Sequence, residues 1–471
     1  MSHIKPLLTA WVLTCTATAL FSQPAGYNYD ESKVPSYTLP DPLVFNDGSR
    51  VKTATDWTLR RRAEVFRLFE EHVYGRSPKQ RGALRYQVLS VDPNALGGRA
   101  TRKQIQIELT SAQWGPRVDL LVYLPNHVQG PVPAFIGYNF YGNHTIHADP
   151  GIKLPDSWCR ASKDFGVVNN RATEKGRGVR SSRWAVETLL ARGYALATMY
   201  YGDVEPDHKD GWMSSLRAYH LAPGRTQPEP AAWGAIGAWS YGLSRAMDYL
   251  ERDAGIDARR VALMGHSRLG KTSLWGGASD ERFAIVISND SGCGGAALSR
   301  RAFGETVKRI NTSFPHWFND NFNRYNENEG ACPVDQHMLI ALIAPRPVYV
   351  ASAVEDKWAD PNGEFLSAKH AEPVYALFDR KGLGTDRQPP VDHPVGDAIG
   401  YHVRTGKHDV TDYDWARYLD FADRHFNHQP KPVTNPAKDT GRMRLNPESR
   451  SPAPTGGTAK NRFPDECPVV S

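Results

Sequence analysis

The chain has 471 residues, of which 40% are hydrophobic and 23% are charged. This length and composition allow a full-sized buried core, which excludes a disulfide-stapled miniprotein and an intrinsically disordered chain. The 57 basic residues exceed the 51 acidic ones and give a net charge of +6. Because the basic residues form no block interleaved with aromatic ones, we expect no nucleic-acid partner.

The N-terminus is typical of an export signal. Residues 1–22 contain Lys5, then an uncharged apolar run, and then small and polar residues before Gln23. The run is short for a membrane span. It therefore predicts a cleaved signal peptide over residues 1–22 and a secreted or periplasmic mature protein with no membrane-embedded part.

The hydrophobic pattern changes along the body of the chain. Extended segments come first, at residues 84–91, 104–109 and 118–124, and the last two alternate like a half-exposed antiparallel pair. Strand-length runs follow, most of them continuously apolar, at residues 132–138, 195–200, 260–264, 283–288, 347–353 and 399–404. Helical patterns lie between and after these runs, at residues 183–191, 232–253, 268–278, 335–343, 363–380 and 413–426.

Strands without polar alternation are buried on both faces, because helices cover both sides of a parallel sheet. An antiparallel start followed by repeated strand–helix units predicts an α/β class protein with the α/β-hydrolase fold. We expect a three-layer αβα sandwich with a mostly parallel central sheet and antiparallel N-terminal strands. Residues 23–428 form this single domain, which we expect to be a monomer.

Residues 429–471 differ from the domain in composition. They are rich in Pro, Asn, Ser, Thr and Gly, have no hydrophobic periodicity, and carry seven basic and four acidic side chains. We expect a flexible tail here. Much of the net positive charge therefore lies outside the domain, which is nearly balanced.

Four cysteines follow the predicted signal peptide, namely Cys159, Cys293, Cys332 and Cys467. An oxidising compartment permits disulfides, and four cysteines allow three pairings between which the sequence does not decide. We single out a Cys293–Cys332 bridge, because it would brace the irregular region between these two residues.

The strongest chemical signal is a serine that follows a buried strand. The strand runs into Gly265-His266-Ser267, and a helical pattern begins directly afterwards. A serine on such a tight strand-to-helix turn presents its hydroxyl above the sheet edge, so Ser267 is the predicted nucleophile. The sequence departs from G-x-S-x-G, since Leu269 stands at the second glycine position and Gly270 follows it. The alternative is a serine that caps an ordinary turn.

A serine hydroxyl needs a base and an acid, which follow the nucleophile in the order acid, histidine in this fold. His408 lies between the last predicted strand and the last helix, where the base is expected. His402 lies within the strand and is expected to pack. Asp356 and Asp290 each follow a predicted strand, and either could accept the imidazole N–H. The alternative for each aspartate is the capping of a turn.

Several segments resemble the glucuronoyl esterases, carbohydrate esterase family fifteen. They are Gly265–Lys271, Asp290–Gly295, Phe303–Thr306, Val334–Pro347 and Lys357–Pro361. The resemblance implies a serine esterase that cleaves, through an acyl-enzyme, esters between 4-O-methyl-glucuronate of xylan and lignin alcohols. It also implies no metal or other cofactor. The expected partners are therefore glucuronoxylan and lignin–carbohydrate esters.

The resemblance also assigns roles to residues around the serine. It implies that Arg268 assists the oxyanion and that Lys271, Glu305 and Trp358 hold the uronate. The chemistry fits, because a guanidinium adds a charged donor and an indole offers a flat face for a sugar ring. The alternatives are core packing for Trp358 and solvated helix charges for Lys271 and Glu305.

Two departures from the family pattern matter. Many members, notably the fungal ones, have a cysteine before the nucleophile and a glutamate at the position of Asp290, whereas this chain has His266 and a shorter carboxylate. These departures favour a bacterial-type member. We expect Asp356 to share or take over the role of the acid, because Asp290 reaches less far towards His408.

Three further interpretations complete the prediction. A second backbone oxyanion donor is expected near Asn139 and Phe140. His144, His147 and Asp149 could suggest a metal site, but no further ligands lie nearby and we expect a polar loop. The alternatives to the glucuronoyl esterase are an acetyl xylan esterase-like deacetylase and a carbohydrate-binding protein on a degenerate hydrolase scaffold. The intact order of serine, acid and histidine argues against the binding protein.

Overall fold

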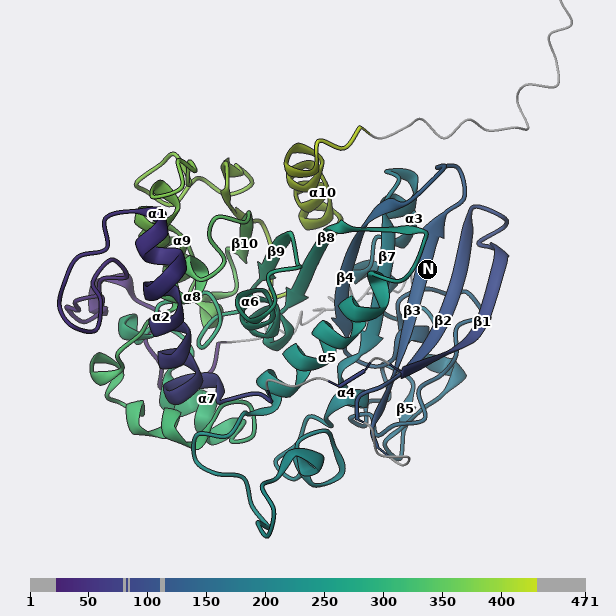
Figure 1. Ribbon diagram of the computed structural model, residues 1–471, viewed down its shortest axis with the longest axis horizontal. Helices are drawn as coiled ribbons and strands as arrows, with labels where there is room; N and C mark the ends of the chain where they lie inside the picture. The colour runs from purple at the N-terminus through teal and green to yellow at the C-terminus, as the bar shows by residue number, and fades with distance from the viewer. Residues whose placement is uncertain (1–22, 79–81, 84, 111–114, 430–471) are drawn as a thin grey trace, which may run out of the picture. The chain divides into compact units, whose positions relative to one another are not determined.

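The computed structural model describes residues 23–78, 82–83, 85–110 and 115–429 (Figure 1). The predicted signal peptide and residues 430–471 of the predicted tail lie outside these ranges, so both stay predictions. No helix within the described ranges is long and apolar enough to cross a membrane.

A ten-stranded sheet forms the centre of the described residues, in the order β1-β2-β3-β7-β4-β8-β9-β10-β12-β11. The six neighbouring strands β7, β4, β8, β9, β10 and β12 run parallel to one another. At one edge, β1, β2 and β3 pair antiparallel with one another and β3 pairs antiparallel with β7, and at the other edge β11 pairs antiparallel with β12. This is the predicted mostly parallel sheet with antiparallel N-terminal strands. The strands are β1 (Arg85–Ala95), β2 (Ala100–Glu108), β3 (Arg117–Pro125), β4 (Val132–Asn139), β7 (Ala195–Tyr200), β8 (Ile256–His266), β9 (Ile285–Asn289), β10 (Val348–Ala353), β11 (Val395–Gly396) and β12 (Ile399–Arg404). A separate small hairpin pairs β5 (Val167–Val168) with β6 (Arg171–Ala172).

Helices cover both faces of the sheet, as predicted for a three-layer α/β-hydrolase. In β8, Val261 and Leu263 pack with one set of helices, and Ala262 and Met264 pack with the other. All four side chains are buried, which explains the missing polar alternation. The first face carries α2 (Arg62–Phe69), α5 (Ala235–Leu250), α6 (Arg268–Ser279), α7 (Val307–Ser313), α8 (Gln336–Ala341) and α9 (Pro361–Ala376), and the second carries α3 (Val186–Ala191) and α10 (Asp412–Phe426).

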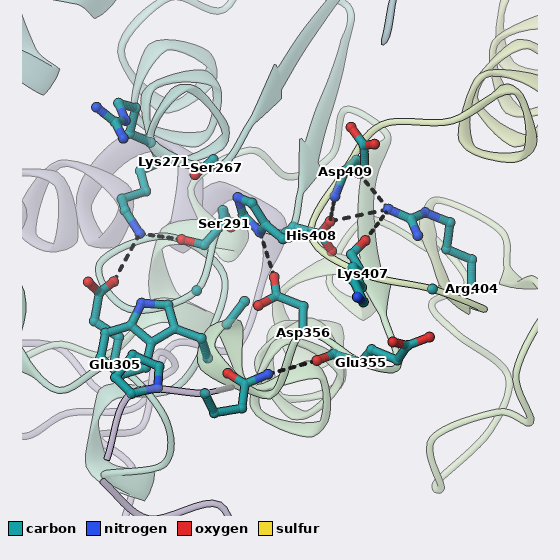
Figure 2. A pocket seen from close by; sticks show the side chains of 18 of the residues that line it. Ser267, Lys271, Ser291, Glu305, Glu355, Asp356, Arg404, Lys407, His408 and Asp409 are labelled. Atoms are coloured by element: carbon teal, nitrogen blue, oxygen red, sulfur yellow. Dashed lines mark hydrogen bonds and ion pairs between the residues drawn. The ribbon is translucent and has the colours of Figure 1, made fainter. Parts of the chain in front are cut away.

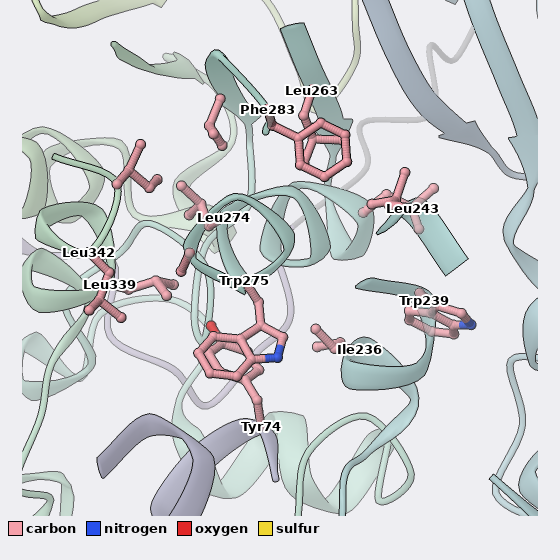
Figure 3. Close-up of a cluster of buried hydrophobic side chains, with 14 of the residues drawn as sticks. Tyr74, Ile236, Trp239, Leu243, Leu263, Leu274, Trp275, Phe283, Leu339 and Leu342 are labelled. Atoms are coloured by element: carbon pink, nitrogen blue, oxygen red, sulfur yellow. The ribbon is translucent and has the colours of Figure 1, made fainter. Parts of the chain in front are cut away.

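Helix α6 is anchored by aromatic stacking on the first face (Figure 3). Trp275 stacks on Tyr74 with ring centroids 4.6 Å apart and on Phe66 with centroids 4.8 Å apart. Leu274, on the same helix, belongs to the same buried cluster as Leu339 of α8. Such dense packing fixes the position of α6, and therefore of the turn at its N-terminus.

An N-terminal helical segment was not predicted. It comprises α1 (Ala54–Asp56), a π-helical turn at Trp57–Arg61, α2, and a second π-helical turn at Glu70–Tyr74. Ten of its 21 residues are apolar or aromatic, and the buried Trp57, Val65, Phe69 and Val73 stand at multiples of four residues, which is a helical signal that sequence reasoning missed. A further short helix, α4 (Tyr201–Val204), follows β7 directly.

The predicted Cys293–Cys332 disulfide is wrong, because both residues are buried free thiols. An ion pair braces this region instead. Arg300 lies 3.2 Å from Asp335 and donates hydrogen bonds to the carbonyl oxygens of Gly330 and Cys332. The geometry of the loop is therefore held by a buried arginine, which cysteine spacing does not reveal.

Candidate active site

Ser267 lies on a strained turn between β8 and α6. Its φ of 59° and ψ of −128° are unusual for a residue with a side chain. The turn is tied to the sheet, because the Ser267 N–H donates to the carbonyl oxygen of Asn289 at 2.9 Å. At Gly265, an added Cβ would lie 1.9 Å from the backbone oxygen of Leu269, so only glycine fits there.

The departure from G-x-S-x-G has a packing explanation. The position where the second glycine was expected is occupied by Leu269, whose side chain is buried in the core. A Cβ on Gly270 would instead lie 2.9 Å from the Cβ of Ser291. The glycine therefore stands one place later because that position of α6 faces the turn after β9.

A cavity of about 1000 Å³ opens above the turn and brings together the predicted site residues. Figure 2 shows several of these side chains projecting from different elements towards the same space. The predicted residues that line the cavity are Ser267, Arg268, Lys271, Asp290, Glu305, Asp356, Trp358 and His408.

Asp356 is the carboxylate that contacts His408 directly. Its Oδ2 atom lies 2.6 Å from Nδ1 of His408, as the dashed line in Figure 2 marks. Asp356 follows β10 and is buried, whereas the His408 side chain is 41% exposed. A buried carboxylate on Nδ1 orients the imidazole and leaves Nε2 for proton transfer.

Arg404 shapes the loop that carries His408, and sequence reasoning missed it. Its guanidinium donates to the carbonyl oxygens of Thr405, Lys407 and Asp409 at 2.6 to 3.0 Å. Its Nε donates to Asp414 of α10 at 2.8 Å. The available signal was an arginine at the end of a fully buried strand, which needs polar partners.

Asp290 lies close to this pair without a bond to the imidazole. One oxygen accepts the N–H of Asp409 at 3.2 Å and lies 3.5 Å from Arg404, while the other has no partner among the described residues. Burial, and then the charge of Asp356, raise the pKa of Asp290 well above its ordinary value. The two carboxyl groups therefore differ: burial raises the pKa of Asp290, which does not bond to the imidazole, while Asp356 contacts the histidine.

His266 and His402 are packed residues. His266 is buried beside His408, with ring centroids 4.5 Å apart, and its Nδ1 lies 2.5 Å from Oδ1 of Asn289. Burial and the neighbouring His408 hold the pKa of His266 well below its ordinary value. His402 contacts Asp414 at 2.9 Å inside the core. Neither ring lines the cavity.

Lys271, Glu305 and Trp358 form one wall of the cavity. Nζ of Lys271 donates to the carbonyl oxygens of Ser291 and Cys293 and lies 3.9 Å from Glu305 (Figure 2). Burial lowers the pKa of Lys271 and raises the pKa of Glu305. The Glu305 N–H donates to the carbonyl oxygen of Trp358 at 3.0 Å, so the two residues are placed together.

The N-terminal segment of the domain also reaches the cavity, which sequence reasoning did not foresee. Gln23 lines the cavity and donates to the carbonyl oxygen of Glu355 at 2.9 Å. Tyr27 packs edge-on against Trp358, with ring centroids 4.9 Å apart. Glu31 pairs with Arg301 at 2.7 Å. This segment therefore supports the same wall.

Glu364 was also missed, although it organises the turn after β9. One oxygen accepts the N–H groups of Ser291 and Gly292 at 2.8 and 2.9 Å, and the other accepts the Ser352 hydroxyl at 2.6 Å. Burial is the main cause that raises the pKa of Glu364 to about 7. The residue is a buried carboxyl with a structural role, and nothing in its local sequence indicates this.

Asp290, Asp356 and His408 also form a cluster of side chains of the types that bind metal ions. Their ligand atoms lie within 4.8 Å of one another, and theirs is the one such group in the described part of the chain. However, the guanidinium of Arg404 already places a positive charge beside Asp290. Asp149, considered above as a ligand, is engaged by Arg102 at 2.5 Å and by the Tyr123 hydroxyl.

Arg268 begins α6 and faces the cavity, but its guanidinium is not free. It forms an ion pair with the buried Asp207 and lies over the ring of Trp317, 4.9 Å from the centroid. A hydroxyl on a strained turn, a carboxylate-oriented imidazole and a held cation provide the groups needed for nucleophilic attack on an ester.

Comparisons with known proteins agree with this chemistry. The family described as "Glucuronyl esterase, fungi" matches residues 225–379. A curated relative from an unknown prokaryotic organism, named carbohydrate esterase MZ0003, is 53% identical over 86% of this chain and 94% of its own length.

Two solved structures match equally well. A promiscuous CE15 esterase from a marine bacterial metagenome is 53% identical, with a TM-score of 0.80, over 85% of this chain and 100% of that one. The glucuronoyl esterase from Solibacter usitatus is 50% identical, with a TM-score of 0.80, over 84% and 100%. The chain therefore belongs to the glucuronoyl esterases of carbohydrate esterase family fifteen, a family of carboxylic ester hydrolases with the α/β-hydrolase fold.

Proposed function

We propose that this protein hydrolyses esters of glucuronic acid, with or without a 4-O-methyl group, through an acyl-enzyme on Ser267. The observation that carries the proposal is the 2.6 Å contact between Asp356 and His408 in the cavity that Ser267 lines. The names of the family and of the Solibacter relative support the uronoyl ester as substrate.

In the first half of the reaction, Oγ of Ser267 attacks the ester carbonyl carbon while Nε2 of His408 takes the hydroxyl proton. Asp356 stabilises the imidazolium that forms. Arg268 and backbone N–H groups, among which we expect one near Asn139 and Phe140, stabilise the developing oxyanion. Collapse breaks the bond to the alcohol, which leaves with the proton from His408.

In the second half, water attacks the acyl-enzyme. Nε2 of His408 takes a proton from the water, the second tetrahedral intermediate collapses, and the proton returns to Oγ of Ser267. The uronic acid is released. The cycle consumes one water molecule for each ester bond that is cleaved.

The wall formed by Lys271, Glu305 and Trp358 suits a uronoyl group. Lys271 and Glu305 supply a donor and an acceptor for sugar hydroxyls, and Trp358 supplies a flat apolar face. We propose glucuronoxylan joined to lignin alcohols as the natural substrate, and export through the predicted signal peptide as the route to it.

Replacing the nucleophile tests the proposal. We expect Ser267→Ala to abolish hydrolysis of a benzyl glucuronate ester, because the remaining groups provide no nucleophile for an acyl-enzyme. Release of benzyl alcohol is the measurement, with circular dichroism to show that the variant is folded. Retained hydrolysis by the folded variant would contradict the proposal. A parallel assay on an acetyl ester, expected to be the poorer substrate, distinguishes a deacetylase.

A further inference from the structure

Arg268 shares the buried Asp207 with several other donors. One Asp207 oxygen accepts from Nε2 of His316 and Nε1 of Trp317, both at 2.8 Å. The other accepts the Tyr201 hydroxyl at 2.9 Å and pairs with Arg268. A carboxylate with this many donors is held in one orientation.

The loop that carries Asp207 is itself anchored. Glu205, two residues earlier, forms a buried ion pair with Arg217 at 2.6 Å and accepts the Ser215 hydroxyl at 2.8 Å. Its carbonyl oxygen accepts Nε1 of Trp239 on α5 at 3.0 Å. The backbone from which the Asp207 side chain projects is therefore held in place.

Two of the partners of Asp207, Arg268 and Trp317, lie at the wall of the cavity. Arg268, Trp317 and Phe314 line the cavity, and the rings of Phe314 and Trp317 stack with centroids 3.8 Å apart. The Arg268 guanidinium lies over both rings, 4.9 Å from the centroid of Trp317 and 5.6 Å from the centroid of Phe314. One carboxylate thus fixes a cation and the aromatic surface on which the cation rests.

A second carboxylate, Glu305, lies within the electrostatic reach of Arg268. Glu305 lines the same cavity, and the charge of Arg268 is among the influences that lower its pKa, although burial raises it overall. A long arginine side chain without Asp207 would be free to turn towards Glu305. Burial favours the neutral form of Asp207, yet Arg268 and the donors from His316 and Trp317 hold the pKa of Asp207 below its ordinary value, so it stays ionised.

We propose that Asp207 is a positioning residue that holds the Arg268 guanidinium against Trp317, so that the remaining N–H groups of Arg268 face the anion formed on the ester carbonyl. The inference rests on the function proposed above for Arg268. Asp207 itself does not touch the reacting atoms. It acts through Arg268, so its effect is on kcat and requires Arg268 to be present.

A double-mutant cycle tests this dependence, with kcat and KM measured on a benzyl glucuronate ester. We expect Arg268→Ala to lower kcat about a hundredfold through loss of an oxyanion donor. Asp207→Asn should lower kcat at least about tenfold through misplacement of the cation, with little change in KM. In the Arg268→Ala background, Asp207→Asn should cause no further loss of kcat.

Asp253→Asn is the matched control, because Asp253 is also a buried aspartate that pairs with a cation, Lys103, and accepts a tyrosine hydroxyl, and neither Asp253 nor Lys103 lines the cavity. We expect it to lower the melting temperature and to leave kcat of the folded enzyme unchanged. Tyr201→Phe is a milder variant should Asp207→Asn fail to fold. It deletes one hydrogen bond to the oxygen that pairs with Arg268, and we expect a smaller loss of kcat that disappears in the Arg268→Ala background.

The outcomes separate the two proposals. If Arg268→Ala lowers kcat while Asp207→Asn and Tyr201→Phe do not, the role of Asp207 is overturned and the function of Arg268 stands. Losses that multiply in the double variants would also overturn it, because they show an effect independent of Arg268. If Arg268→Ala keeps the wild-type kcat, both the positioning role and the oxyanion role of Arg268 fail, whereas the Ser267→Ala result is unaffected.

Discussion

Two carboxylates reach the neighbourhood of His408, and their surroundings give them different properties. Asp356 contacts Nδ1 of the imidazole at 2.6 Å, whereas Asp290 bonds to the backbone of Asp409 and lies near Arg404. The two carboxyl groups and the imidazole lie within 4.8 Å of one another, so two negative charges there would repel. The charge of Asp356 is, after burial, a cause of the raised pKa of Asp290.

Amide variants of the two aspartates should separate their roles. We expect Asp356→Asn to lower kcat about a thousandfold or more, because an amide at this place favours the wrong imidazole tautomer. Asp290→Asn should cause a smaller loss, since Asp290 does not bond to the imidazole and the amide oxygen can still accept the N–H of Asp409. Steady-state kinetics on a glucuronate ester provide the comparison. A wild-type rate in Asp356→Asn would reverse the assignment.

Glu364 should make stability depend on pH. Because its pKa is raised to about 7 in the fold, the folded protein retains a proton that the unfolded chain releases above its ordinary pKa near 4.5. The stability contributed by this proton is fully present below pH 4.5 and is lost as the pH rises towards 7, by roughly 3 kcal/mol.

Glu364→Gln should remove this contribution, because the amide can still accept from the two N–H groups and donate to Ser352. Urea unfolding of both proteins between pH 4.5 and 8 provides the test. The variant should gain stability relative to the wild type as the pH rises. Asp203, whose pKa burial likewise raises to about 7, keeps its own slope in both proteins. A pH-independent difference between the two proteins would contradict the interpretation.

At the scale of elements, the turn between β8 and α6 depends on close backbone contact. The strand and helix approach so closely that a side chain at Gly265 would collide with the backbone oxygen of Leu269. Flexible side chains can yield to such a collision, but backbone atoms cannot without moving the turn. A side chain added at Gly265 would therefore also displace Ser267.

Gly265→Ala should destabilise the protein by about 3 kcal/mol or more and lower esterase activity. Gly276→Ala, in the adjoining helix α6, is the control, because its added Cβ meets only ordinary contacts at 3.4 Å and beyond. We expect that control to be as stable as the wild type or up to about 1 kcal/mol more stable, since alanine favours helix. Chemical denaturation measures both, and equal stability of the two variants would refute the close-contact argument.

At the scale of the whole molecule, the described residues are held by packing and ion pairs, with no disulfide among them. Cys159, Cys293 and Cys332 are buried free thiols. Burial is the main cause that raises the pKa of Cys159 to about 11 and that of Cys332 to about 12. Such thiols stay protonated and shielded from reagents.

We therefore expect these thiols to be unreactive in the native protein. In a Cys15→Ser, Cys467→Ser variant, a disulfide exchange reagent should modify no cysteine in buffer and three in guanidinium chloride. A reductant should leave the melting temperature unchanged. Fewer than three reactive thiols after unfolding, or a fall in melting temperature with reductant, would show a disulfide that the structure lacks.

The types and order of most elements, the turn at Ser267, and the position of His408 after the last long strand were predictable from the amino-acid sequence. These features depend on local patterns, such as uninterrupted apolar runs and glycines at fixed offsets, which are readable within a few residues. The helical segment at residues 54–74 was missed although Trp57, Val65, Phe69 and Val73 recur at helical spacing, and the cysteine pairing was wrong because spacing does not give distance.

The carboxylate that contacts His408, and the buried groups that hold the site in place, became apparent from the fold. Asp207 lies 61 residues from Arg268 in sequence, and Glu364 lies 73 residues from Ser291. Each of these residues is an ordinary loop or helix charge in its own sequence context. The charge acquires its role because folding removes water and leaves one set of partners within reach, and neither the removal nor the partners can be read from neighbouring residues.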